Sequence, residues 1–138
     1  MEELKTDYGE TKHFTHIEAW KIDRQIRRKI YGIIRILPDE RNIVYSLRSQ
    51  MGRTATSITA IIAEGYGRFH FQENVQFCRQ SRSSVYEIQD HLITCLDEGY
   101  INEGPLQEVY NLTNSCIEVT NGYIRMLNKQ KDQGQEAR

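Results

Sequence analysis

The chain has 138 residues, of which 38% are apolar and 27% are charged, and its formal net charge is −1. This length fits one domain around a single core, and no apolar run approaches the roughly 20 residues of a membrane-spanning helix. The first ten residues lack the basic flank and the apolar core of a signal peptide, so we expect a cytoplasmic protein.

Apolar residues recur three and four positions apart along the whole chain, which predicts four helices and no strand. The first helix is expected to begin at Thr15, which forms a capping box with Glu18, and to end at Pro38. Its inward side chains should be Ala19, Ile26, Ile30, Ile33, Ile34 and Leu37. Asp23 also falls on this face, where an acid conflicts with its apolar neighbours and marks a candidate interface.

A second helix is expected to follow Asp39, its N-cap, and to run to Glu64. Gly65 then occupies the position of a left-handed cap residue, and Gly67 continues the turn. The inward residues should be Val44, Leu47, Met51, Ala55, Ile58 and Ile62.

The third helix should run from Phe71 to Glu98 and stop at Gly99, and Asn102 should open the fourth. The inward residues of these two helices should be Cys78, Ser81, Val85, Ile88, Leu92, Leu96, Leu106, Tyr110, Thr113, Ile117, Ile124 and Leu127. Short links force neighbouring helices to run antiparallel. We therefore predict an all-α, up-down-up-down four-helix bundle over residues 14–128, with flexible tails at 1–13 and 129–138.

Charge is distributed unevenly, because residues 15–82 carry 12 Lys and Arg against 6 Asp and Glu, whereas residues 83–138 carry 4 against 9. Six of the cations crowd the first helix: Lys21, Arg24, Arg27, Arg28, Lys29 and Arg35. Contact with nucleic-acid phosphates is one interpretation, and a solvated helix face is the other. Arg68 lies in an aromatic segment, residues 66–71, that is typical of base-stacking surfaces but also of loops that close the end of a bundle.

Two further rows of residues predict contacts between subunits. On the second helix, Gln50, Ser57 and Glu64 recur every seven residues, with Arg53 beside them. On the fourth helix, a second apolar row lies beside the inward one and consists of Leu112, Cys116, Val119, Tyr123 and Met126. The alternatives are a solvated face for the first row and a wide core face for the second.

No catalytic or cofactor motif is present. The four histidines form no metal-binding pattern, the glycines at 65 and 67 do not form a phosphate-binding loop, and there is no nucleophile elbow. Cys78, Cys95 and Cys116 are odd in number and set among apolar residues, which favours reduced core thiols. We expect no enzyme activity, no cofactor and no metal.

Residues 57–68, with the sequence S-I-T-A-I-I-A-E-G-Y-G-R, resemble the signature of the four-helix-bundle proteins encoded in intervening sequences of bacterial 23S rRNA genes. The resemblance covers roughly residues 14–127. Outside the signature it rests on Phe14, Trp20, Ile30, Tyr31, Pro38, Leu47, Gln50, Arg53, Ala55, Glu73, Phe77, Ser84, Glu87 and residues 99–101. The chain departs from the family pattern at Asp23, Gly52 and Ile61.

The resemblance implies a non-enzymatic bundle that assembles as a ring, typically a homopentamer, with a nucleic-acid role. The chain is also similar to the accessory variability determinant of diversity-generating retroelements, a pentameric bundle that binds a reverse transcriptase and template nucleic acid. Our leading hypothesis is an oligomer that binds RNA or DNA, with a reverse transcriptase as a candidate partner. The alternative is a protein-interaction scaffold without nucleic-acid contact.

Overall fold

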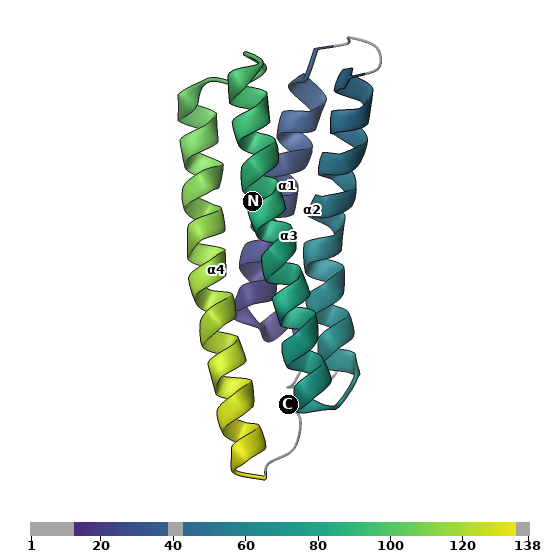
Figure 1. Cartoon of the computed structure of the whole chain (residues 1–138), viewed down its shortest axis with the longest axis vertical. Helices are drawn as coiled ribbons and strands as arrows, with labels where there is room; N and C mark the ends of the chain where they lie inside the picture. The colour runs from purple at the N-terminus through teal and green to yellow at the C-terminus, as the bar shows by residue number, and fades with distance from the viewer. Residues whose placement is uncertain (1–12, 39–42, 135–138) are drawn as a thin grey trace.

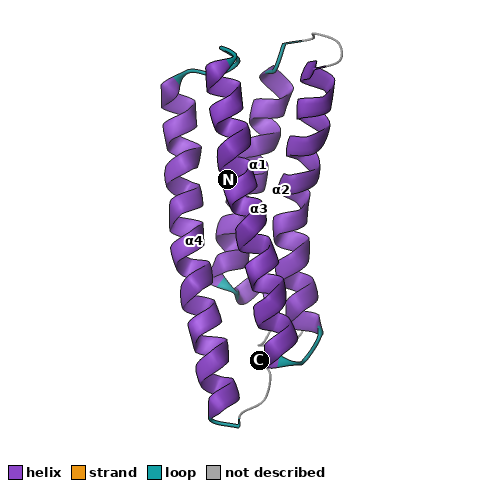
Figure 2. Ribbon diagram, viewed as in Figure 1, coloured by secondary structure: helices purple, strands orange, loops and turns teal. Residues whose placement is uncertain are grey.

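Four antiparallel helices form an up-down-up-down bundle in the computed structural model, which describes residues 13–38 and 43–134 (Figure 1). The helical elements are η1 (Phe14–His16), α1 (Glu18–Ile36), α2 (Ile43–Gly67), α3 (Phe71–Asp97) and α4 (Glu103–Asp132). Figure 2 shows these helices and their connecting loops, and no strand occurs among the described residues. The predicted fold class is confirmed.

The helices pack in the cyclic order α1, α2, α3, α4, so that α1 lies diagonally opposite α3. The α1 helix has 19 residues and α4 has 30. The C-terminal turns of α4 therefore extend below the level at which α1 begins (Figure 1). In the described part of the chain, α1 therefore does not face these last turns of α4.

The apolar faces lie where the sequence pattern predicts them. All six inward residues predicted on α2 are buried: Val44, Leu47, Met51, Ala55, Ile58 and Ile62. The predicted inward residues that are only half-buried are Ile34, Leu96, Leu106 and Tyr110. Because removing apolar surface from water is the dominant favourable term in folding, this core is what holds the four helices together.

A polar layer divides the core into two apolar clusters. The larger cluster includes Ile26, Ile58 and Val85, and the smaller one includes Trp20, Ile62, Cys78 and Ile124. Three buried polar residues lie between them along α1, α3 and α4: Asp23, Ser81 and Thr120. The bundle thus encloses an acidic group in its interior.

The turn between α2 and α3 differs from the prediction. Gly65 is not a left-handed cap, because α2 continues through it to Gly67 and the residue with positive φ is Phe69, at 58°. Gly65 is instead required by close packing, since a Cβ atom there would lie 2.7 Å from Phe77 Cβ and 3.0 Å from Asn74 Oδ1. Glycine at this position lets α2 and α3 approach each other.

Two helix ends also differ from the prediction. Thr15 does not cap α1: it lies in η1, where it is hydrogen-bonded to His13, and the N-cap of α1 is Ile17, without a side-chain hydrogen bond. The α4 helix does not end at residue 128 but continues to Asp132. The predicted stops at Pro38 and Gly99 are confirmed, and the predicted cap Asp39 lies outside the described residues.

Candidate nucleic-acid interface

The six cations predicted as a single cluster on α1 extend in different directions. Arg27 leans toward α2 and donates a hydrogen bond to Thr59 Oγ1 at 2.7 Å. Lys29 leans toward α4, where its ammonium lies 2.6 Å from a Glu108 carboxylate oxygen. Arg27 and Lys29 therefore each make a polar contact with a neighbouring helix.

Of the other four cations, Lys21, Arg28 and Arg35 are exposed and Arg24 is half-buried. Lys21, Arg28 and Arg35 are seven residues apart, so they follow one line along α1, and Arg24 lies one turn after Lys21. We call these four residues the α1 basic face. Lys21 pairs with Glu18 at 3.2 Å, whereas Arg28 and Arg35 are exposed and have no ion-pair partner among the residues that the structure describes.

Arg68 does not join the α1 basic face. Its guanidinium lies 3.0 Å from Glu64 and 5.1 Å from the ring centroid of Phe77 on α3, the helix diagonally opposite α1. The salt bridge is exposed and contributes little to stability. Arg68 therefore belongs to a different side of the bundle from the other predicted phosphate contacts.

Asp23 and Cys116, both predicted at a subunit interface, lie inside the single chain. Asp23 is 0% exposed, and Cys116 Sγ donates to its Oδ1 at 2.8 Å while Ser81 Oγ lies 3.4 Å from Oδ2. Burial raises the pKa of Asp23 to about 7, and the two hydrogen bonds offset part of this increase. The prediction was wrong because α4 packs against both α1 and α3, so its buried face includes Cys116 as well as Ile117.

The polar row predicted on α2 faces outward. Gln50, Arg53 and Glu64 are exposed, and Ser57 is half-buried and donates to the Thr54 carbonyl at 2.7 Å. Gln50 bonds Ser46 at 3.3 Å on the same helix, and no hydrogen bond or ion pair joins this row to another helix among the described residues. It is available to a second molecule.

Three of the remaining residues of the second α4 row, Val119, Tyr123 and Met126, line a groove, whereas Leu112 does not. Leu112 is half-buried against the core, and Met126 is 43% exposed. The groove has a volume of about 590 Å³, and its lining includes His16, Ile17, Val119, Tyr123, Met126 and Gln130. We call it the η1–α4 groove, because its lining comes mainly from η1, the first residues of α1 and the C-terminal half of α4.

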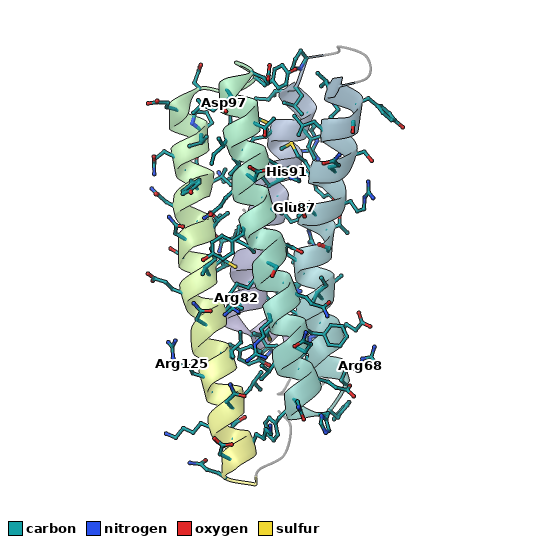
Figure 3. The ribbon with its side chains drawn as sticks, viewed as in Figure 1. Arg68, Arg82, Glu87, His91, Asp97 and Arg125 are labelled. Atoms are coloured by element: carbon teal, nitrogen blue, oxygen red, sulfur yellow. The ribbon has the colours of Figure 1, made fainter. Side chains whose placement is uncertain are left out.

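A second group of cations was missed by the sequence analysis. Arg79 and Arg82 of α3 lie at the same end of the bundle as three cations of α4: Arg125, Lys129 and Lys131. Figure 3 shows Arg82 and Arg125 in the same half as Arg68, and Glu87 and Asp97 in the other half. The sequence analysis ended the fourth helix at residue 128 and so left Lys129 and Lys131 outside it. With the helix extended to Asp132, antiparallel pairing of α3 with α4 predicts that these cations lie near Arg79 and Arg82.

Between Arg82 and Arg125 the sequence contains no Lys or Arg but seven acids. Six of these acids lie on the upper halves of α3 and α4: Glu87, Asp90, Asp97, Glu98, Glu103 and Glu108. The α3–α4 hairpin is therefore negative at its tip and positive at its opposite end.

The three thiols are free and buried, as predicted. Burial raises the pKa of Cys78 to about 12 and that of Cys95 to about 11, so neither is a reactive thiolate near neutral pH. Across the described ranges 13–38 and 43–134, no group of three or more His, Cys, Asp or Glu residues could hold a metal ion. Within the same ranges, no helix has the length and hydrophobicity needed to cross a membrane.

The sequence profile of the family described as "23S rRNA-intervening sequence protein" matches residues 15–122. The chain belongs to this family. The match includes the whole α1 basic face, α2 and α3, whereas Arg125 and the last turns of α4 lie beyond it. A comparison with curated proteins gives no significant match.

Proposed function

We propose that this member of the 23S rRNA-intervening sequence protein family binds RNA, without catalysing a reaction, through its α1 basic face. The observation that carries the proposal is the row of Lys21, Arg28 and Arg35, in which both arginines are exposed and lack an acidic partner among the described residues. The row spans roughly 20 Å at the rise of an α-helix. Cations arranged in this way suit successive phosphates of a nucleic-acid backbone.

RNA is favoured over DNA by the description of the family, which refers to an rRNA sequence. The cations of the α1 basic face would contact phosphates and would position the RNA without selecting a sequence. Binding of this kind depends mainly on charge and shape, as is usual for structured RNA.

We further propose that the protein acts as a closed homo-oligomer, a pentamer by its similarity to ring-forming bundles. The α2 row of Gln50, Arg53, Ser57 and Glu64 supports this proposal, because among the described residues no hydrogen bond or ion pair joins these side chains to another helix of the chain. A ring repeats the α1 basic face, so that individually weak phosphate contacts add together. A reverse transcriptase that acts on the bound RNA is the protein partner suggested by similarity to the retroelement accessory protein.

The test is RNA binding measured at several salt concentrations by fluorescence anisotropy, with an RNA hairpin, single-stranded DNA and duplex DNA as probes. We expect affinity for the hairpin to fall steeply with salt, and replacement of both Arg28 and Arg35 by Gln to reduce the log–log slope by roughly 1.5 to 2 units. Arg79→Gln on α3 is the matched control and should change the slope less. Absence of binding at low salt, or an unchanged slope in the double variant, would overturn the proposal.

A scaffold function is supported by a different observation. The acidic tip of the α3–α4 hairpin would repel RNA and would suit a basic protein partner. This function would be the better explanation if none of the three nucleic-acid probes binds.

A further inference from the structure

A second hollow lies between the start of α3 and the end of α4. Both of these helix ends are at the lower end of the bundle in Figure 1, and the hollow has a volume of about 500 Å³. Its lining residues come from His70, the first turns of α3 and the last turns of α4, and none comes from α1. We call it the α3–α4 hollow. It is separate from the α1 basic face.

The two helices line this hollow with polar side chains. Gln72, Gln76 and Arg79 are four and three residues apart, so they follow one line along α3, and Asn128 and Lys131 share one side of α4. Because α3 and α4 are antiparallel, these two lines meet at the same hollow. Val75, which is 4% exposed, is the only apolar residue in its described lining.

Positive charge from both helices converges on the hollow. Arg79 comes from α3 and Lys131 from α4, and His70 adds a third charge when it is protonated. Glu73 also lines the hollow, yet neither Arg79 nor Lys131 forms an ion pair or a side-chain hydrogen bond among the described residues. Two such cations favour an anion between them, and the dipole of α3, which begins here, adds to the positive potential.

The rest of the lining suits hydroxyl groups. The side-chain amides of Gln72, Gln76 and Asn128 can each donate and accept hydrogen bonds, and none of them does so within the described part of the chain. The Glu73 carboxylate is a further acceptor. The hollow is much larger than one phosphate group, and its lining offers no apolar wall for a flat ring. A hydroxylated anion therefore fits it better than an aromatic one.

From the size, the polar lining and the converging cations we propose that the α3–α4 hollow binds a phosphate monoester of a hydroxylated small molecule, such as a sugar phosphate. A monoester carries a charge of about −1.5 to −2 near neutral pH, which Arg79 and Lys131 match. The Arg79 guanidinium can hold two phosphate oxygens at once, while the amides and Glu73 bind the hydroxyl groups. The terminal phosphate of an RNA chain has the same chemistry.

The experiment is isothermal titration calorimetry of the full chain with ribose 5-phosphate, inorganic phosphate, ribose and malonate, a dianion without phosphate. Three variants probe the hollow: Arg79→Gln, Lys131→Gln and Gln76→Leu. Lys129→Gln is the matched control, because Lys129 is an exposed cation of the same helix that does not line the hollow. Circular dichroism of each variant shows whether it is folded.

We expect ribose 5-phosphate to bind more tightly than inorganic phosphate or malonate, and ribose not to bind. Arg79→Gln and Lys131→Gln should each weaken binding of ribose 5-phosphate about tenfold, because each removes a charge-assisted hydrogen bond. Gln76→Leu should lower this affinity towards that for inorganic phosphate, and Lys129→Gln should change it by about twofold at most. No binding at roughly 10 mM ligand, equal binding of malonate, or equal losses in Lys129→Gln and Lys131→Gln would overturn the inference.

An RNA hairpin prepared with and without a terminal phosphate distinguishes the two sources of the monoester. Tighter binding of the phosphorylated hairpin that Arg79→Gln abolishes would identify RNA ends as a ligand. Equal binding of the two hairpins, with ribose 5-phosphate bound as expected, would identify a free small molecule. The Arg28 and Arg35 double variant should keep its affinity for ribose 5-phosphate, so the proposed RNA-binding function and this site can fail separately.

Discussion

Replacement of Asp23 by Asn should stabilise the bundle, and more strongly as the pH rises. Asp23 is completely buried, and its pKa is raised from 3.8 to about 7, chiefly by desolvation. Asn has nearly the same shape as a protonated Asp: its amide oxygen can still accept the hydrogen bond from Cys116, and its amide nitrogen can donate to Ser81 Oγ, which itself donates to the Ile58 carbonyl. The substitution removes the cost of ionising this site and leaves the packing nearly unchanged.

The sign and the size of the effect follow from linkage. An acid whose pKa is higher in the folded state binds its proton more tightly there, so the free energy of unfolding falls as the pH rises from about 4 through about 7. A pKa increase of about three units corresponds to roughly 4 kcal/mol once Asp23 is fully ionised. About 3 kcal/mol of this loss should develop between pH 5 and pH 8.

Urea denaturation at pH 5 and pH 8 measures this contribution. The quantity of interest is the change in unfolding free energy between the two pH values in the unmodified protein, minus the same change in Asp23→Asn. The exposed substitution Glu64→Gln is the control for loss of a carboxylate at the surface. A difference below about 1 kcal/mol would show that Asp23 is solvated or paired in solution, which would refute the reasoning.

Three further predictions concern packing and assembly. Ile58→Ala, at a fully buried position, should lower the free energy of unfolding in urea by roughly 2–5 kcal/mol, and a loss below about 1 would contradict its place in the core. Gly65→Ala should lower it by roughly 1–3 kcal/mol because the new Cβ meets Phe77, whereas Gly67→Ala has open space and should be neutral or stabilising in the same assay. Arg53→Glu should lower the mass measured by light scattering if α2 contacts a second subunit, and an unchanged mass would exclude Arg53 from the interface.

The helices could be predicted from the sequence because their buried faces repeat every three to four residues, and this period depends only on helix geometry. What could not be predicted depends on distances between helices. Gly65 has the sequence context of a helix cap, but it is needed because Phe77 lies against it, and a one-dimensional pattern contains no such information. The close contact of Gly65 with α3 appears only once the two helices are paired.

The positions of the charged side chains also could not be predicted fully from the sequence, because they depend on contacts between helices. Arg27, Arg28 and Lys29 are adjacent in the sequence but point in different directions around α1, because consecutive residues of a helix are about 100° apart. Arg27 bonds Thr59 and Lys29 pairs with Glu108 on neighbouring helices, whereas Arg28 has no ion-pair partner among the described residues. A helical wheel likewise cannot show that α4 extends past the start of α1, because that depends on the relative lengths of two helices far apart in the sequence. Of the cations proposed to contact RNA, Arg28 and Arg35 are both exposed and form no ion pair with the described part of the bundle.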